Sequence, residues 1–120
     1  MKAEKRTDKV IVKKIIDYCD KVEILIERFG STYEKFDLDF GFQMACGMCI
    51  MQIGELTTRL SEEFKNQHSE IAWNKIKGMR NIYAHDYENL DLEKIWATLT
   101  QDVPTLKENL NEIYLTLTED

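Results

Sequence analysis

The chain has 120 residues, a length that fits a single domain over residues 1–120 with one hydrophobic core. Hydrophobic residues make up 43% of the chain and charged residues 32%, as in soluble globular proteins, and no apolar run approaches the roughly 20 residues that span a bilayer. The net charge of −6 argues against a general nucleic-acid binder, and no membrane partner is expected.

Two further features bear on the compartment. The N-terminal residues lack the apolar stretch of a signal peptide. The three cysteines are an odd number, which does not suit a disulfide framework. We therefore expect a cytoplasmic protein.

An apolar stripe predicts the first helix, from about Asp8 to about Arg28. Its members are alternately four and three residues apart, which places them on one helical face: Ile11, Ile15, Tyr18, Val22, Leu25 and Phe29. Gly30 indicates a break after this helix. Ser31 and Glu34 have the spacing of a capping pair for a short turn.

A second helix is predicted from about Asp37 to about Phe64. Its apolar face is expected at five positions, where the methionines are interpreted as core residues: Phe40, Met44, Met48, Met51 and Leu56. Gly47 and Gly54 also lie in it, although each glycine costs about 1 kcal/mol relative to alanine. Because they are seven residues apart they share a face, which predicts close approach of another helix, within the chain or across a dimer. Packing within the chain is the preferred interpretation.

Two more helices are predicted, from about Glu70 to about His85 and from about Asp91 to about Leu117. Pro104 lies inside the apolar stripe of the last one. Because proline removes a backbone donor and clashes with the preceding turn, we expect a kink or a short break there. Together the patterns predict an all-α antiparallel bundle of four or five helices.

The charge is unevenly distributed. The segment from Ile71 to His85 contains three cations, Lys75, Lys77 and Arg80, and no carboxylate. A basic patch on an acidic body can hold a short stretch of RNA. The acidic remainder could also suit a basic protein partner.

The segment Arg80-Asn81-Ile82-Tyr83-Ala84-His85-Asp86-Tyr87 concentrates reactive groups near the end of a predicted helix. The fork of Arg80 matches phosphate oxygens, His85 can move protons near neutral pH, and Tyr87 has a hydroxyl that can bind or be modified. These residue types indicate chemistry on a phosphodiester. On a regular helix, however, His85 would point about 140° away from Arg80. Either the helix ends before His85 and the backbone turns it back, or two chains contribute.

The pattern Arg-x4-His-x-Tyr resembles the signature of HEPN domains, specifically of HepT-like toxins paired with MNT-type nucleotidyltransferase antitoxins. The match at Arg80, His85 and Tyr87 is complete, and the polar Asn81 is also usual there. The sequence around the motif also resembles that of the family, in four segments: Ile53-Gly54-Glu55, Trp73-Asn74-Lys75-Ile76-Lys77-Gly78-Met79, Ile95-Trp96 and Asp102-Val103-Pro104. The resemblance covers about residues 8–117.

This resemblance implies a homodimeric ribonuclease toxin in which the motifs of two protomers form one composite cleft. The implied reaction is endonucleolytic cleavage of RNA, such as mRNA or tRNA, without a metal or cofactor. The ribose 2′-hydroxyl attacks the adjacent phosphorus and leaves a 2′,3′-cyclic phosphate. His85 is expected to move protons and Arg80 to stabilise the phosphate, while Asn81 orients one of them.

The remaining residues in and before the motif have other expected roles. Lys75 and Lys77 are expected to bind RNA, and Tyr83 either lines the cleft or simply packs. The resemblance also implies that the antitoxin adenylylates Tyr87. The added phosphate would block the cleft and neutralise the arginine.

Two alternatives belong to other functional classes. One is a non-catalytic substrate-binding subunit of a nucleotidyltransferase, and the other is a helical assembly protein. The intact pair of Arg80 and His85 disfavours both. Cys46 and Cys49 have the spacing of a redox pair or half a zinc site, but their apolar helix favours buried packing residues.

Overall fold

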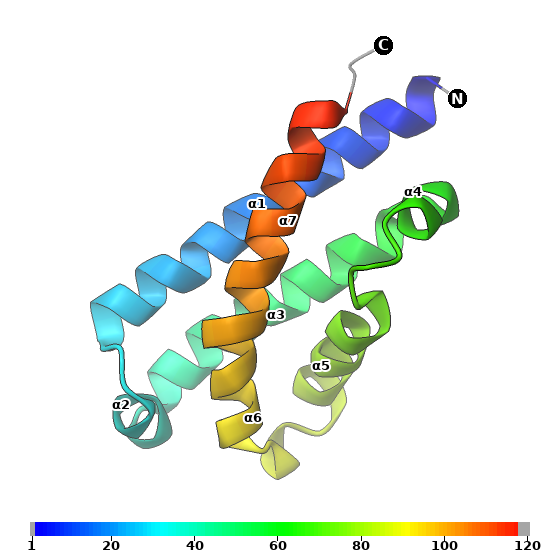
Figure 1. The fold of residues 1–120 in the computed structure, drawn as a ribbon. Helices are drawn as coiled ribbons and strands as arrows, with labels where there is room; N and C mark the ends of the chain where they lie inside the picture. Colours follow the sequence, from blue (N-terminus) through cyan, green and yellow to red (C-terminus); the bar gives the residue numbers. More distant parts are fainter. Residues whose placement is uncertain (1, 118–120) are drawn as a thin grey trace.

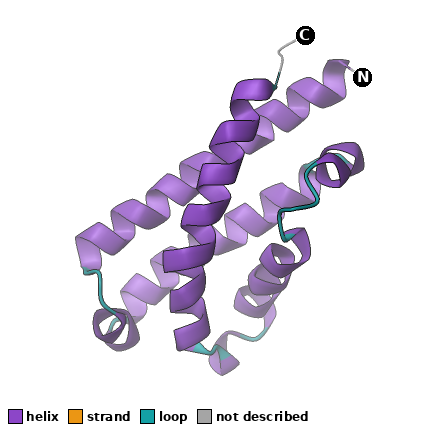
Figure 2. Ribbon diagram, in the orientation of Figure 1, coloured by secondary structure: helices purple, strands orange, loops and turns teal. Residues whose placement is uncertain are grey.

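The computed structural model describes the backbone of residues 2–117 and the side chains of residues 7–117. Over this range the chain is helical and contains no strand, as Figures 1 and 2 show, which confirms the predicted all-α class. The elements are α1 (Lys2–Phe29), α2 (Tyr33–Leu38), α3 (Phe40–Arg59), α4 (Glu62–Gln67), α5 (Trp73–His85), the 3-10 helix η1 (Tyr87–Asn89), α6 (Leu92–Ala97), the π-helix η2 (Thr98–Asp102) and α7 (Val103–Thr116).

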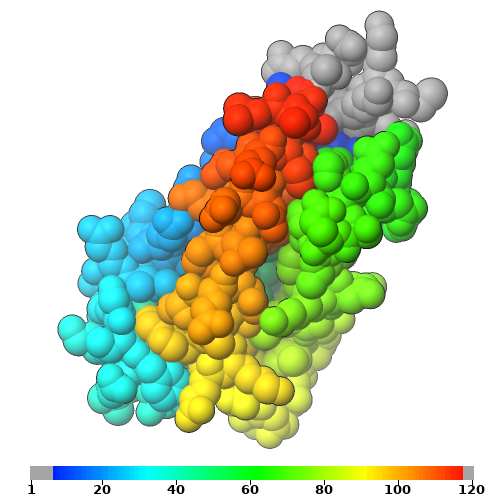
Figure 3. Space-filling view, in the orientation of Figure 1, coloured from blue at the N-terminus to red at the C-terminus, as the bar shows by residue number. Residues whose placement is uncertain are grey.

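Helix α3 is the centre of the arrangement. It packs against α1 on one side and against α5 on the other, and α7 packs on α1. Helices α1 and α3 run antiparallel along the long dimension of the molecule (Figure 1). In the space-filling view α7 runs up the middle of one face, with α5 beside it (Figure 3). Helix α5 is therefore held mainly through α3.

The predicted helix over residues 37–64 is interrupted in two places, and this part of the prediction was wrong. Asp39 has an extended backbone, and its Oδ1 accepts from Phe42 N at 3.2 Å, so α3 starts anew there. Ser61 Oγ accepts from Phe64 N at 3.1 Å and starts α4. Side-chain caps of this kind satisfy the free N–H groups at a helix start and so favour a new helix over continuation. The first short helix is capped by Thr32, not by Ser31.

Where a kink or a short break was expected near Pro104, the type of helix changes and the backbone stays helical. The five residues of η2 form a π-helical turn between α6 and α7, and Pro104 lies in the first turn of α7. Val103 N–H donates to Thr98 O five residues back, whereas Pro104 has no N–H to donate and in a regular α-helix its ring would clash with the carbonyl four residues earlier. The wider turn before it accommodates the ring.

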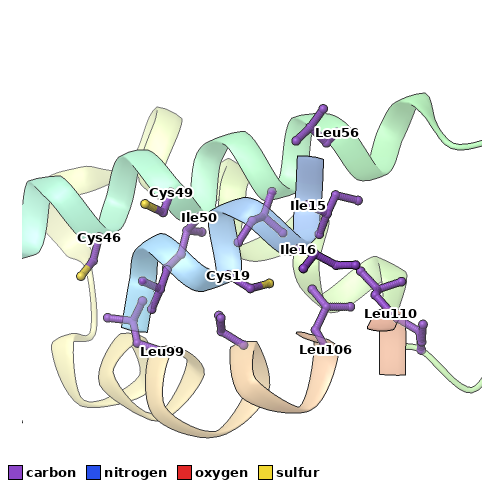
Figure 4. Close-up of a cluster of buried hydrophobic side chains, with 14 of the residues drawn as sticks. Ile15, Ile16, Cys19, Cys46, Cys49, Ile50, Leu56, Leu99, Leu106 and Leu110 are labelled. Carbon is purple, nitrogen blue, oxygen red and sulfur yellow. The ribbon is translucent and has the colours of Figure 1, made fainter. Parts of the chain in front are cut away.

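The core lies where α1, α3 and the segment from α6 to α7 meet. Figure 4 shows side chains from these helices interdigitating, among them Ile15 and Cys19 of α1, Ile50 of α3 and Leu110 of α7. Cys19, Cys46 and Cys49 are free and buried, so the interpretation of the cysteines as packing residues is confirmed. Burial raises the pKa of the Cys19 and Cys46 thiols to about 12.

The expected core role of the apolar face of α3 was wrong in part. Phe40 is 74% exposed, and Met44 and Met48 are each 56% exposed. The buried residues of α3 point instead toward α1 and α5, and include Phe42, Cys46, Cys49, Ile50 and Ile53. Because α3 is apolar on nearly all sides, its sequence pattern did not distinguish the covered faces from the open one.

Candidate functional site

Two glycines on α3 allow α5 to approach closely. A Cβ atom on Gly47 would collide with the ring of Tyr83, and one on Gly54 would collide with the Cβ and Cγ atoms of Arg80. The predicted close approach is therefore made within the chain. Through these contacts α3 fixes the position of the helix that carries the motif.

Arg80 is held on both sides of its guanidinium group. Its Nη2 donates to Glu55 Oε1 at 2.9 Å, and its Nη1 donates to Asn81 Oδ1 at 2.9 Å. The side chain of Arg80 is 31% exposed and that of Glu55 is 42% exposed, so the pair lies at the surface. The guanidinium is oriented and still open to solvent.

His85 is exposed and is the last residue of α5. The helix does not end before it, because Asp86 is the C-cap and its N–H donates to Ile82 O at 2.9 Å. Regular helical geometry therefore separates Arg80 and His85 by about 140° around the axis. Among the described residues, no hydrogen bond joins the side chain of His85 to Arg80 or to Asn81. One chain alone does not bring the two motif residues together.

The two tyrosines of the motif differ in exposure. Tyr87 is exposed in η1, with its ring 6.1 Å from that of Tyr83. Tyr83 is buried against Gly47, and its hydroxyl donates to Gln43 O at 3.5 Å. Burial raises the pKa of Tyr83 well above its ordinary value. Of the two expectations for Tyr83, this position favours packing beneath the motif over direct contact with RNA.

The lysines of the basic segment lie toward the other end of α5. Lys75 and Lys77 are both exposed and border a hollow whose other lining residues come from the end of α3, from α4 and the loop after it, and from the first turn of α5. Lys75 Nζ lies 2.9 Å from Asp102 Oδ2 of η2. Lys77 lies one helical turn before Arg80, so it adds a second positive charge to this side of α5.

Glu55 is the site residue that the sequence interpretation did not include. Glu55 belongs to the flanking sequence that resembles the family, and the sequence alone assigned it no role. A signal was present nonetheless: Gly54 marks the place where α5 approaches α3, and the next residue is an acid that can reach the arginine. A glycine at a helix contact therefore points to its neighbours as candidate partners.

The part of the chain that the structure describes contains no group of three or more His, Cys, Asp and Glu side chains placed to hold a metal ion. None of the described helices is long and apolar enough to cross a membrane.

The chain is similar to a family of ribonucleases. The model of that family, described as "Ribonuclease HepT-like", matches residues 15–113. The chain is 32% identical over 109 residues to "Putative RNase TTE0752" of Caldanaerobacter subterraneus subsp. tengcongensis, a match that covers 90% of this chain and 95% of the relative. It is 33% identical over 93 residues to "Probable ribonuclease HepT" of Thermococcus cleftensis, which covers 76% of this chain and 84% of the relative. No solved structure gives a significant match.

Proposed function

Because this chain belongs to the HepT-like ribonuclease family, we propose that it is the RNA-cleaving toxin of a toxin–antitoxin pair. The observation that supports the proposal is the placement of Arg80 and His85 on α5. A guanidinium group is held in a fixed orientation at the surface, and an exposed histidine lies at the end of the same helix. A cation that stabilises the phosphate and a group that transfers protons both support transesterification of RNA.

In the proposed reaction a ribose 2′-hydroxyl attacks the adjacent phosphorus. The 2′-oxygen loses its proton as the new P–O bond forms, the bond to the 5′-oxygen breaks, and that oxygen receives a proton as it leaves. The products are a 2′,3′-cyclic phosphate and a 5′-hydroxyl. Arg80 binds the phosphate and stabilises its growing negative charge, while His85 transfers a proton. DNA lacks the attacking hydroxyl and is not a substrate.

We propose that the complete site forms in a homodimer. Since Arg80 and His85 point about 140° apart on one helix, a second copy is needed to bring both groups to one phosphate. An apolar surface for this contact is available on α3, where Phe40, Met44 and Met48 are exposed at intervals of four residues. This stripe adjoins Gly47, against which Tyr83 packs, so a dimer formed there lies next to the motif.

The proposed antitoxin is an MNT-type nucleotidyltransferase that adenylylates Tyr87. The exposure of Tyr87 supports this role, because the hydroxyl of a modified residue must reach the active site of another enzyme. Tyr83 in the same segment is buried and so is a poor acceptor. An adenylyl phosphate at Tyr87 would add negative charge near the cleft and occupy the place of RNA. The proposed target is mRNA or tRNA, with Lys75 and Lys77 binding its backbone.

The experiment that tests the proposal uses the purified chain, shown by intact mass to carry no adenylyl group, with total RNA and tRNA in excess EDTA. We expect cleavage that leaves a 2′,3′-cyclic phosphate and that is lost in Arg80→Ala and in His85→Ala. The absence of cleavage by the unmodified wild-type chain contradicts the ribonuclease proposal and favours a substrate-binding subunit of a nucleotidyltransferase.

Mixing the two inactive variants tests the composite site. If each site takes Arg80 from one protomer and His85 from the other, mixed dimers of Arg80→Ala and His85→Ala contain one intact site and regain activity. If both groups act within one protomer, the mixture stays inactive. Unfolding and refolding the variants together ensures that subunits exchange.

A further inference from the structure

We infer that Glu55 is a positioning residue that orients Arg80 for the reaction. This inference rests on the proposed function, because it assigns a role in RNA cleavage to a residue outside the Arg-x4-His-x-Tyr motif. Glu55 lies on α3, 25 positions before Arg80 in the chain, and reaches it only through the packing of α3 against α5.

The geometry gives the guanidinium two separate anchors. Glu55 Oε1 accepts from Nη2 and Asn81 Oδ1 accepts from Nη1, each at 2.9 Å. Asn81 is on the same helix as Arg80 and moves with it. Glu55 is on the neighbouring helix and therefore fixes the side chain relative to the rest of the fold. With both anchors in place, rotation about the terminal bonds of Arg80 is restricted.

The backbone supports the same arrangement. Gly54 allows α3 to lie against the Cβ and Cγ atoms of Arg80, which confines the aliphatic part of the side chain. The guanidinium group is thereby within reach of Glu55, the residue after Gly54. A guanidinium group has five N–H donors, and the two anchors engage two of them. Three donors are left for a phosphate. Glu55 thus orients the guanidinium group and leaves most of its donors available for a phosphate.

Positioning by a carboxylate has a consequence that distinguishes it from simple phosphate binding. A negative charge beside the binding site weakens attraction to RNA, because it offsets part of the positive charge of Arg80. Its benefit must therefore appear in the chemical step, where a preorganised donor stabilises charge that develops in the transition state. Removal of Glu55 should lower kcat and leave RNA affinity unchanged or stronger.

The first measurement needs no activity. Nitrogen-15 NMR of the arginine side chains reports how freely each guanidinium rotates, and Arg80→Lys identifies the signal of Arg80. We expect restricted rotation of Arg80 in the wild-type chain and free rotation in Glu55→Ala. Free rotation in the wild-type chain would overturn the inference whether or not the protein cleaves RNA.

The second measurement separates affinity from chemistry. It compares kcat for a cleavable RNA with the Kd for the same RNA carrying a 2′-O-methyl group at the cleaved position. We expect Glu55→Ala to lower kcat roughly tenfold, with a Kd no weaker than that of the wild type. Glu55→Gln keeps an oxygen that can accept from Nη2, so it should restore part of kcat. Glu108→Gln, which removes one charge from the exposed surface of α7, is the matched control and should change neither quantity.

The outcomes are distinguishable. Restricted rotation of Arg80 together with an inactive, unmodified wild-type chain would contradict the proposed function while leaving the anchoring of Arg80 by Glu55 in place. Activity in the wild type with an unchanged kcat in Glu55→Ala would overturn the inference alone. A parallel loss of kcat, RNA affinity and unfolding free energy in Glu55→Ala would also overturn it, because that pattern indicates a structural role only.

Discussion

Arg80 and His85 lie five residues apart on one helix, yet their surroundings differ. Arg80 is half-buried, its stem is confined by Gly54, and its head group is held by Glu55 and Asn81. His85 is exposed at the final position of α5, and no hydrogen bond of its side chain occurs among the described residues. In the proposed reaction a group that binds a phosphate benefits from a fixed position, whereas the proton-transferring group would meet substrate atoms that a second protomer of the proposed dimer helps to place. One end of the motif is therefore held in place within the chain, and the other end is the one that the proposed dimer would complete.

The largest expected effect is at the unanchored end. His85→Ala should lower kcat by about 10²–10⁴-fold, the usual contribution of a general acid–base group. It should leave the free energy of unfolding nearly unchanged, since the side chain is exposed. Cleavage kinetics and urea denaturation measure the two quantities.

The other histidine of the chain provides the control for this change. His68 is the C-cap of α4, and its ring lies 4.6 Å from that of Phe64. His68→Ala should retain wild-type cleavage even if it loses some stability. Equal losses of activity in the two histidine variants would contradict a specific role for His85.

The anchored end should respond to a change of shape at constant charge. Arg80→Lys keeps the positive charge but loses the planar fork that meets Glu55, Asn81 and a phosphate at once. We expect kcat to fall by about 10²–10³-fold, as when one donor to a developing oxyanion is lost. Arg59→Lys, an exposed arginine at the end of α3, is the matched control. Wild-type activity in Arg80→Lys would mean that charge alone suffices.

Much of this arrangement could be predicted from the sequence, for physical reasons that particular residues illustrate. The alternating stripe from Ile11 to Phe29 predicted α1 because apolar residues on a single face determine both the helix and its buried side. The motif could be found because its reactive residues are close in sequence. Close approach of another helix to Gly47 and Gly54 could be inferred because glycine in a helix interior is costly unless a neighbour needs the space, although the structure was needed to identify that helix as α5.

The rest depended on tertiary contacts. The stripe of Phe40, Met44 and Met48 has the period of a core face, and only packing decides which side of an apolar helix stays open. Residues 37–64 read as one helix because the interruption near Ser61 is favoured by a distant residue: Asp8 accepts from both Ser61 N at 2.9 Å and Ser61 Oγ at 2.7 Å. Glu55 belongs to the site because it contacts Arg80, which is 25 positions later in the chain, and no local sequence pattern reveals such a contact.

The packing that confines Arg80 can be tested with a pair of glycines. Gly54→Ala places a methyl group against the Cβ and Cγ atoms of Arg80, and overpacking of this kind costs about 1–3 kcal/mol of unfolding free energy. Gly78→Ala places one on α5 where no atom lies within 4 Å, so it should stabilise the helix by about 1 kcal/mol. Urea denaturation measures both. Equal effects of the same sign would contradict the close approach at Gly54.

The smallest expected effects concern RNA binding by the two lysines of α5, of which, among the described residues, one is in an ion pair with a carboxylate and the other is not. Lys75 already lies 2.9 Å from Asp102, so its charge is partly offset, whereas no ion pair of Lys77 occurs among the described residues. Lys77→Ala should weaken binding of an uncleavable RNA severalfold and reduce the salt slope of the affinity by about 0.7, the value for one phosphate contact on a single strand. Lys75→Ala should have a smaller effect, because the lysine must leave Asp102 to meet a phosphate.

If the two variants lose equal affinity, the Lys75–Asp102 pair does not persist when RNA binds. If neither loses affinity, the RNA path does not pass this end of α5.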